Sequence, residues 1–406
     1  MANTMNNEKK QIDEEDCAED EQIVTPWEAS CGSKGFDYQR LVEKFGVQPI
    51  DQAMLDRFEK VTGHEPHIWL KRGHFFAHRG LNEVLDSYEK GEPIMIYTGR
   101  GPTSECLHLG HMIPISFTVW LQKVFNAVVV FQMADDEKYW FRNMPFQEVY
   151  DLGFKNARDI IACGFDKDRT FIFSNRDFSR DPHYGKVFCD ILNNVNINQI
   201  KSIFGIKDSD KAGQLVWPVY QTVAAFSQAF QHIYEGKKVK CLVAYAIDQD
   251  PYFRMARDVA PKLGFDKPCS IMCTFLPALA GSAKMSSTGQ SPTIYMDYSP
   301  EQIMEVVKKF AFSGGQETKK LHQELGADLS VDISYQYLTY FMEDDQELKQ
   351  IAQDYSSGKM MTSEIKQLMA AIISKFVEKH KAIKDTVTDE DVADFYKVRP
   401  LKVVRE

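Results

Sequence analysis

The 406-residue sequence contains no hydrophobic run that could cross a bilayer and no closely paired cysteines. No apolar stretch is as long as a membrane-spanning helix, which needs about 18 residues or more. The first residues are polar, which excludes a hydrophobic targeting segment. The eight cysteines include no C-x-x-C pair, and scattered thiols are typical of a reducing compartment. These absences predict a cytoplasmic protein with no membrane partner.

Basic residues are fewer than acidic ones, but the imbalance is local. The formal net charge is -10, and residues 1–22 hold eight of the acids against two lysines. Beyond them the chain is nearly balanced, so any surface for nucleic acid must be a local basic patch. We interpret residues 1–22 as an acidic flexible tail, because they offer few apolar groups to offset the entropy of ordering.

The rest of the chain has the composition of a globular protein and enough length for two or three domains. Five β-rich runs alternate with longer helical patterns, notably 112–125 and 146–161; the runs are 93–97, 127–131, 170–173, 239–243 and 270–273. Nearly continuous apolar strands separated by helices predict an α/β fold, with a parallel sheet covered on both faces.

The strand signal ends near residue 300. Beyond it the apolar spacing predicts helices over 302–312, 331–342, 347–355 and 362–384. We therefore divide the chain into a tail (1–22), an N-terminal extension (23–91), an α/β domain (92–299), a helical domain (300–396) and a C-terminal tail (397–406).

A glycine-rich turn follows the first run of the α/β domain and ends at His108-Leu-Gly-His111. Such a turn in a parallel sheet commonly binds a nucleotide. The dinucleotide pattern is incomplete, since Ser104 replaces its third glycine, and the G-x-x-x-x-G-K-[ST] loop is absent. Two imidazoles three residues apart at a helix start can donate hydrogen bonds to phosphate oxygens. The alternative is that they only cap and pack the helix.

A second motif, Gly281-Ser-Ala-Lys284-Met-Ser-Ser287, follows the last run of the α/β domain. A lysine on a flexible segment can neutralise a departing pyrophosphate, although a solvated loop with one lysine is a common alternative. Both motifs in one chain, in this order on either side of an α/β sheet, are far more specific than either alone.

This pair of motifs resembles the signatures of the class I aminoacyl-tRNA synthetases. Four further segments, 97–102, 135–139, 246–254 and 311–315, are similar to tryptophanyl-tRNA synthetases of the eukaryotic and archaeal branch. The likeness runs from about Thr25 to Tyr396. It implies a Rossmann-like catalytic domain with a helical insertion, a helical anticodon-binding domain, and an N-terminal extension that packs near the active site.

The resemblance implies a two-step ligase reaction. The tryptophan carboxylate attacks the α-phosphorus of ATP, giving tryptophanyl-adenylate and pyrophosphate, and the acyl group then passes to the 3′-terminal adenosine of tRNA(Trp). No covalent nucleophile is required, so positioning and charge stabilisation carry the catalysis. The resemblance further implies Mg²⁺ held mostly by the ATP phosphates, and a symmetric homodimer.

The resemblance also assigns residue roles. The catalytic residues would be His108, His111, Lys284 and Ser286. ATP would further contact Gly99, Arg100, Gly110 and Met285. Tyr97 and Gln132 would meet the indole N–H of tryptophan, and the groups around its amino and carboxylate ends would be Glu137, Gln221 and Gln249. A buried indole needs an acceptor for its one polar atom, and phenylalanine would leave that acceptor unpaired. For Gln132 the alternative is a bond to backbone at the edge of the sheet.

No metal site in the protein is predicted. Four histidines lack the spacing or the third ligand of a zinc site: His64, His67, His74 and His78. Asp135 and Asp136 would need another acid at Tyr139 to form a D-D-x-x-D metal motif. We predict instead that these two aspartates cap a helix N-terminus and complement its dipole.

Local basic surface for tRNA is available in the helical domain, at Lys308, Lys309, Lys319, Lys320, Lys375, Lys379, Lys381 and Lys384. Solvated helix faces are the alternative for each. Three other functions remain open. They are a tyrosyl-tRNA synthetase, with a hydrogen-bonding group aimed at a phenol; a small nucleotidyltransferase, which would not need the helical domain; and a synthetase-like RNA-binding protein without catalysis.

Overall fold

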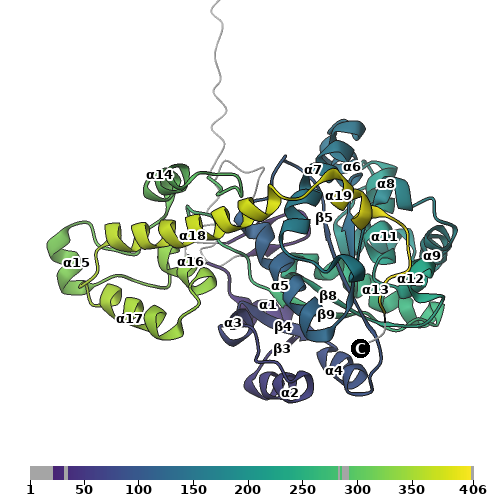
Figure 1. Cartoon of the computed structure of the whole chain (residues 1–406), viewed down its shortest axis with the longest axis horizontal. Helices are drawn as coiled ribbons and strands as arrows, with labels where there is room; N and C mark the ends of the chain where they lie inside the picture. The colour runs from purple at the N-terminus through teal and green to yellow at the C-terminus, as the bar shows by residue number, and fades with distance from the viewer. Residues whose placement is uncertain (1–21, 32–34, 282–283, 286–291, 404–406) are drawn as a thin grey trace, which may run out of the picture.

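The computed structural model describes residues 22–31, 35–281, 284–285 and 292–403. A seven-stranded sheet lies at its centre (Figure 1). In spatial order its strands are β3 (Gln48–Pro49), β4 (Phe75–Arg79), β9 (Cys269–Cys273), β8 (Lys240–Ala246), β5 (Ile94–Arg100), β6 (Val128–Met133) and β7 (Thr170–Ser174). The five strands from β9 to β7 are parallel, which confirms the predicted α/β fold.

Two strands of the sheet were not predicted. Strand β4 pairs antiparallel with β9, and β3 pairs antiparallel with β4. Both come from the segment that the sequence indicated only as an extension. A further two-stranded hairpin, β1 (Ile23–Val24) with β2 (Ala29–Ser30), precedes them. The N-terminal segment therefore completes one edge of the seven-stranded sheet.

The parallel strands are apolar throughout because helices cover both of their faces. Every residue of β6 is buried. Alternate side chains point to opposite faces, so Val129 and Phe131 join one hydrophobic cluster while Val128 and Val130 join the other. The first cluster also contains side chains of α4 (Leu81–Glu89) and α5 (Leu109–Phe125). The second contains side chains of α9 (Pro182–Leu192), α11 (Ala212–Val223) and α13 (Asp250–Leu263).

The other helices of this part of the chain connect the strands. They are α1 (Tyr38–Phe45), α2 (Gln52–Thr62), α3 (Ile68–Lys71), α6 (Glu137–Arg142), α7 (Phe146–Ala162), α8 (Asn175–Phe178), α10 (Ile197–Phe204) and α12 (Gln231–Tyr234). The predicted helices at 112–125 and 146–161 correspond to α5 and α7. No helix in the described ranges combines the length and the apolar character that crossing a membrane requires.

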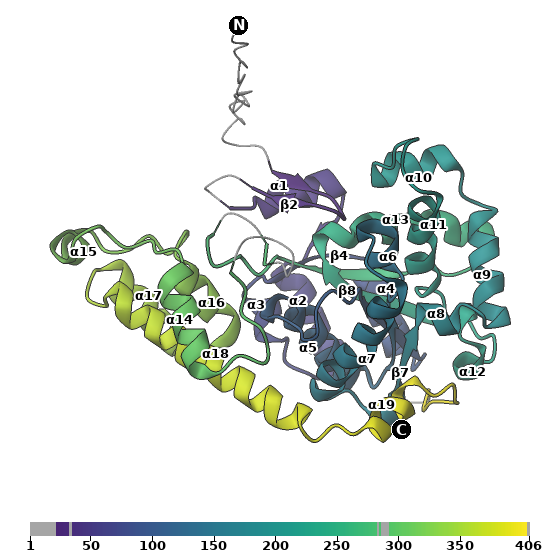
Figure 2. The same ribbon diagram turned by 90° about the horizontal axis from the view of Figure 1, so that it is seen from above.

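Beyond residue 300 the described chain is helical, as predicted. Its helices are α14 (Pro300–Phe310), α15 (Lys319–Leu325), α16 (Ile333–Phe341), α17 (Asp345–Ser356), α18 (Thr362–Lys384) and α19 (Asp389–Tyr396). Figure 2 shows α18 leading from the group α14–α17 back to the sheet. There α19 packs on β7 and α7. Helix α19 thus fastens the helical region to the α/β part.

The junction of α18 with the sheet contains a buried charge. The carboxylate of Asp159, on α7, is fully buried and lies 2.9 Å from Lys384 Nζ and 3.2 Å from His380 Nε2. Lys384 was one of the lysines predicted to offer basic surface. Its charge is instead used inside the protein, where it compensates a carboxylate that water does not reach.

A second buried ion pair joins the antiparallel edge of the sheet to α13. Arg79 of β4 donates to both carboxylate oxygens of Asp250, at 3.0 and 2.9 Å, and the Tyr245 hydroxyl donates to Asp250 Oδ1 at 3.1 Å. The Asp250 side chain is fully buried. Two parallel N–H···O bonds of this kind fix geometry as well as charge.

We expect Asp250→Ala to lower the free energy of unfolding by about 3–5 kcal/mol, because the change leaves the Arg79 guanidinium buried without its counter-charge. Urea unfolding followed by circular dichroism would measure the loss. The double variant Arg79→Met/Asp250→Leu is the control, since it removes both charges and should be much less harmful. A double variant as unstable as the single one would contradict this explanation.

Candidate active site

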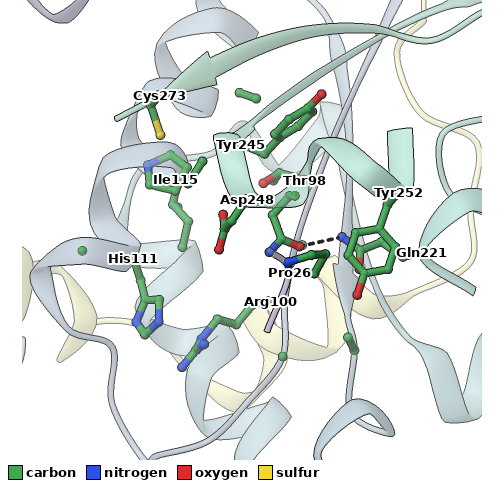
Figure 3. A pocket seen from close by; sticks show the side chains of 18 of the residues that line it. Pro26, Thr98, Arg100, His111, Ile115, Gln221, Tyr245, Asp248, Tyr252 and Cys273 are labelled. Carbon is green, nitrogen blue, oxygen red and sulfur yellow. Dashed lines mark hydrogen bonds between the residues drawn. The ribbon is translucent and has the colours of Figure 1, made fainter. Parts of the chain in front are cut away.

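A cavity of about 400 Å³ opens at the carboxyl ends of the parallel strands. Ligands of open α/β sheets bind in this position. Twelve predicted site residues line it: Tyr97, Gly99, Arg100, His108, Gly110, His111, Gln132, Glu137, Gln221, Gln249, Lys284 and Met285. The thirteenth, Ser286, lies outside the described residues. Figure 3 shows His111 and Arg100 on one side of the cavity and Gln221 with Tyr252 on the other.

The two histidines are held by backbone bonds at the start of α5. His108 is the N-cap residue, and its Nδ1 accepts from the Gly110 N–H at 3.1 Å. His111 Nδ1 accepts from the His108 N–H at 3.3 Å. The rings stack with centroids 3.4 Å apart. Because each Nδ1 is an acceptor, the proton of each neutral ring is on Nε2, and both rings keep one N–H donor for a ligand.

Both imidazoles are kept neutral by their surroundings. Burial, with a smaller effect from the positive charge of Arg100, lowers the pKa of His108 to about 3. The same two causes hold the pKa of His111 well below its usual value. The backbone bonds and the low pKa values therefore favour one form, a neutral ring with a proton on Nε2.

Arg100 places a cation at the end of β5. Its Nη2 donates to Thr103 Oγ1 at 3.2 Å, whereas its buried Nε has no hydrogen-bond partner among the described residues. Burial lowers the pKa of Arg100 to about 10, a value at which it is still charged at neutral pH. A buried guanidinium N–H without a partner is costly. An anionic ligand in the cavity would satisfy it.

Lys284 also lines the cavity. Its Nζ lies 2.6 Å from Asp248 Oδ2 and 5.4 Å from the centre of the Phe275 ring. The Asp248 side chain is only 4% exposed, whereas that of Lys284 is 29% exposed. The lysine is therefore the more accessible member of the pair and can exchange its partner for another anion. Asp248 was not predicted as a site residue, although it stands in the segment 246–254 that carried the family resemblance.

Two glycines allow the close approaches that shape this end of the sheet. A Cβ atom at Gly99 would lie 2.9 Å from Gln132 O, the backbone of the neighbouring strand. At Gly101 it would lie 1.8 Å from Glu137 Oε2. A larger residue at position 99 would push β5 away from β6. A larger residue at position 101 would displace the Glu137 side chain.

A chain of hydrogen bonds runs along the opposite end of the cavity. Tyr97 donates its hydroxyl proton to Gln132 Oε1, and Gln132 Nε2 donates to Asn175 Oδ1 at 2.7 Å. Asn175 and Trp217 then donate to Asp136 Oδ1, at 2.9 and 3.2 Å. With its proton committed, the Tyr97 oxygen keeps its acceptor lone pairs. It is suited to accept an N–H from a ligand.

The predicted role of Asp136 as a helix cap was wrong. Asp136 is the residue before α6, but its side chain makes no capping bond and instead accepts from Asn175 and Trp217. Asp135 does not cap α6 either, but it accepts from the Ser174 hydroxyl and from the Arg176 N–H in the first turn of α8, so it caps the start of that helix instead. Burial raises the pKa of Asp135 to about 7. Ser174 ends β7 and Arg176 lies in α8, so local sequence cannot reveal either partner of Asp135.

Three polar side chains complete this end of the cavity. Gln221 Nε2 donates to Gln249 Oε1 at 3.2 Å, the contact drawn in Figure 3. Glu137 pairs with Lys138, with 2.8 Å between Oε1 and Nζ. Together they offer donors and a carboxylate, which suits a ligand with both an ammonium and a carboxylate group.

The N-terminal hairpin closes one side of the cavity. Pro26 and Trp27 line it. The Trp27 ring lies 4.3 Å from that of Phe141, and its Nε1 donates to Phe204 O at 2.8 Å. The hairpin therefore contacts α6, which carries Phe141, and α10, which carries Phe204, beside the end of the cavity that is predicted to bind tryptophan.

The described residues contain no group of three or more His, Cys, Asp or Glu side chains that could hold a metal ion. Of the acids lining the cavity, Glu137 and Asp248 each pair with a lysine.

Residues 89–378 match the family described as tRNA synthetases class I (W and Y). The chain is 45% identical to the cytoplasmic tryptophan–tRNA ligase of Arabidopsis thaliana, over 96% of this chain and 97% of that protein. It is 45% identical to the human cytoplasmic tryptophan–tRNA ligase, over 94% and 82%. The chain belongs to the tryptophanyl-tRNA synthetases.

Solved structures agree with this family. A product-bound parasite tRNA synthetase is 39% identical, with a TM-score of 0.86 over 90% of this chain and 97% of that one. The tryptophanyl-tRNA synthetase from Giardia lamblia is also 39% identical, with a TM-score of 0.84 over 88% and 95%. The predicted family, ligase class and fold of this synthetase are therefore confirmed.

The neutral histidines of the synthetase can be tested directly. Their pKa values lie below the usual 6.5, so the neutral rings should persist from about pH 5 upward and protonate only in more acidic solution. We expect ¹⁵N spectra of the imidazoles to show the Nε2–H form for both residues at pH 5.5. Exposed His183 serves as the reference ring. Titration of His108 near pH 6.5 would contradict the burial argument.

Proposed function

We propose that this synthetase forms tryptophanyl-adenylate in the cavity at the ends of β5 and β6 and then transfers tryptophan to tRNA. One observation carries the proposal. His108, His111, Arg100 and Lys284 direct donors at one cavity, whose other end is lined by Tyr97 and the glutamines. This arrangement fits a phosphate chain at one end and an amino acid at the other. The names of the relatives, tryptophan–tRNA ligases, supply the amino acid and the tRNA.

The ATP end stabilises charge rather than supplying a nucleophile. As the tryptophan carboxylate attacks the α-phosphorus, negative charge grows on the phosphate oxygens and on departing pyrophosphate. The Nε2–H groups of His108 and His111 donate to these oxygens, and Arg100 provides a fixed positive charge. Lys284 leaves Asp248 for the phosphates. Mg²⁺, when bound, neutralises further phosphate charge.

At the amino-acid end, Tyr97 accepts the indole N–H while Gln132 holds the tyrosine hydroxyl in that orientation. Glu137 receives the α-ammonium group, and Gln221 with Gln249 donate to the carboxylate. The carboxylate is ionised at neutral pH, so the attack requires no general base. The tryptophan side chain is selected because an analogue without the N–H leaves buried acceptors unpaired.

The partners follow the same reasoning. We propose that the helical region beyond residue 300 contacts tRNA. Positive charge on α14 and α15 would come from Lys308, Lys309, Lys319 and Lys320. We further propose a symmetric homodimer, in line with the family resemblance. The predicted cytoplasmic location agrees with the names of the relatives.

Amino-acid-dependent exchange of pyrophosphate into ATP tests the proposal. We expect exchange with tryptophan and not with tyrosine, phenylalanine or no amino acid. Charging of tRNA(Trp) transcript would then establish the second step. Exchange with tyrosine would overturn the assignment of the amino-acid end, and folded protein that exchanges with none would overturn the activation chemistry.

Replacing Lys284 by alanine should lower the kcat of adenylate formation about 10²- to 10³-fold, the scale for losing one transition-state donor, with little change in tryptophan affinity. Single-turnover kinetics and equilibrium binding would separate the two effects. Lys240→Ala is the matched control, because Lys240 is also a partly buried, paired lysine but does not line the cavity. Equal losses in rate and affinity would contradict the assigned role.

Replacing Tyr97 by phenylalanine should weaken tryptophan binding about tenfold, since a buried hydrogen bond is lost, and should narrow the preference for tryptophan over phenylalanine. Calorimetry with both amino acids measures the effect. Tyr355→Phe is the control, because its buried hydroxyl donates to Asp332 Oδ2 at 2.7 Å in the helical region and does not line the cavity. Unchanged selectivity in Tyr97→Phe would remove this hydroxyl from the indole site.

A further inference from the structure

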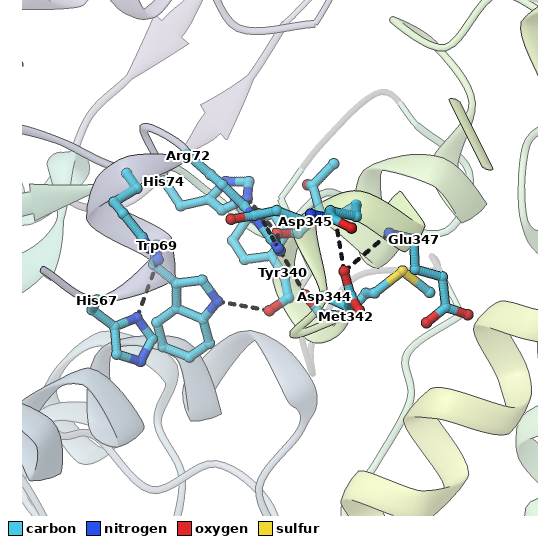
Figure 4. A network of polar contacts seen from close by, with 12 residues as sticks. His67, Trp69, Arg72, His74, Tyr340, Met342, Asp344, Asp345 and Glu347 are labelled. Atoms are coloured by element: carbon cyan, nitrogen blue, oxygen red, sulfur yellow. Dashed lines mark hydrogen bonds and ion pairs between the residues drawn. The ribbon is translucent and has the colours of Figure 1, made fainter. Parts of the chain in front are cut away.

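Helix α16 is anchored at its C-terminal end to the N-terminal part of the chain. Figure 4 shows this contact, in which side chains of residues 67–74 meet the end of the helix. Trp69 Nε1 donates to Tyr340 O at 2.7 Å, and His74 Nε2 lies 3.0 Å from Thr339 O. The last carbonyls of α16, which have no partner within the helix, are therefore bonded to another part of the protein.

Arg72 strengthens the same anchor. Its Nη1 donates to Thr339 O at 2.8 Å and to Met342 O at 2.7 Å, and its Nη2 lies 2.6 Å from Asp345 Oδ1. The Arg72 side chain is only 11% exposed. A cation at a helix C-terminus also complements the helix dipole. Helix α16 is thereby fixed to the segment next to β4.

Two tyrosines on α16 bind the segment that precedes Lys284. The Tyr337 hydroxyl donates to Pro277 O at 2.7 Å. The Tyr340 hydroxyl lies 2.6 Å from Thr274 Oγ1. Both side chains are buried. Further along the segment, the Phe312 N–H donates to Leu279 O at 2.8 Å. Residues 274–279 are thus bonded along their length to the helical region.

The same segment fixes the backbone at Lys284. Pro277 and Lys284 form an antiparallel bridge, and the Met285 N–H donates to Leu276 O at 3.0 Å. Its Phe275 lines the active-site cavity and also a second, mainly apolar cavity of about 490 Å³ on the side of α16. Phe275, Leu276 and Leu279 of this segment belong to the hydrophobic clusters, so apolar packing holds the segment and the tyrosine hydroxyls fix the position of its polar groups.

We propose that Tyr337 and Tyr340 are positioning residues for Lys284. Their hydroxyls hold residues 274–279 at a fixed distance from α16, and this segment in turn sets where the Lys284 ammonium group can reach. Neither tyrosine is among the residues that line the active-site cavity in the described part of the chain. The proposal rests on the role of Lys284 in adenylate formation stated above.

The test removes single hydroxyl groups. Tyr337→Phe and Tyr340→Phe should each lower the kcat of tryptophan-dependent exchange about three- to tenfold, as expected for one lost hydrogen bond. The dissociation constant for tryptophan should not change. Tyr355→Phe is the matched control, because this buried hydroxyl donates to Asp332 Oδ2 at 2.7 Å within the helical region. A loss of kcat in Tyr355→Phe equal to that in Tyr337→Phe would show a general stability effect and overturn the proposal.

A double-mutant cycle with Lys284→Ala decides whether the tyrosine acts through the lysine. If it does, Tyr337→Phe should change kcat less than about twofold once Lys284 is absent, because the two losses are not additive. The same three- to tenfold loss of kcat in both backgrounds would overturn the positioning role of the tyrosine and leave the proposed function standing. Wild-type protein without exchange, or Lys284→Ala with full exchange, would instead overturn the proposed function and the inference with it.

Discussion

The active site depends on the close approach of two parallel strand ends. Gly99 lies so near to Gln132 that a Cβ atom would be 2.9 Å from its carbonyl oxygen. In this register Gly99 of β5 lies opposite Gln132 of β6, and the Tyr97 hydroxyl reaches the Gln132 side chain, while Arg100 is the last residue of β5. Parallel strands end at the same edge, so residues far apart in sequence meet there. The cavity is a consequence of the register of these two strands.

The two ends of the cavity differ in their electrostatic requirements. The phosphate end must attract anions without charging its own histidines, and burial with a nearby guanidinium keeps both rings neutral. Their N–H donors are then fixed by backbone bonds and need no reorganisation as charge develops. The amino-acid end consists mainly of hydroxyl and amide groups, with the Glu137 carboxylate beside them. Its hydroxyl and amide groups are bonded to one another, so each has a defined donor or acceptor direction.

The features predicted from sequence were those with a local signal. Buried parallel strands carry apolar runs, and the histidine and lysine motifs keep a fixed order, so the fold and these two motifs could be predicted from the residues themselves, whereas Gln132, Gln221 and Gln249 were assigned only through the family resemblance. The short strands β3 and β4 could not, because β4 is stabilised by pairing with β9, nearly two hundred residues later. The predicted capping role of Asp136 was wrong for the same reason. Its partners Asn175 and Trp217 come from other elements, and only the assembled structure brings them to it.

The two catalytic motifs are supported in different ways, and this difference suits the reaction. The histidines sit at the start of a long buried helix whose own backbone holds their rings. Lys284 lies beyond a segment with a cavity on either side, held by hydroxyl contacts from α16. In the proposed mechanism the histidine donors need no reorganisation as charge develops, whereas Lys284 must leave Asp248 as pyrophosphate departs and needs freedom to move. Placing the lysine on a segment that the helical region holds allows that region to influence the chemistry without touching the substrate.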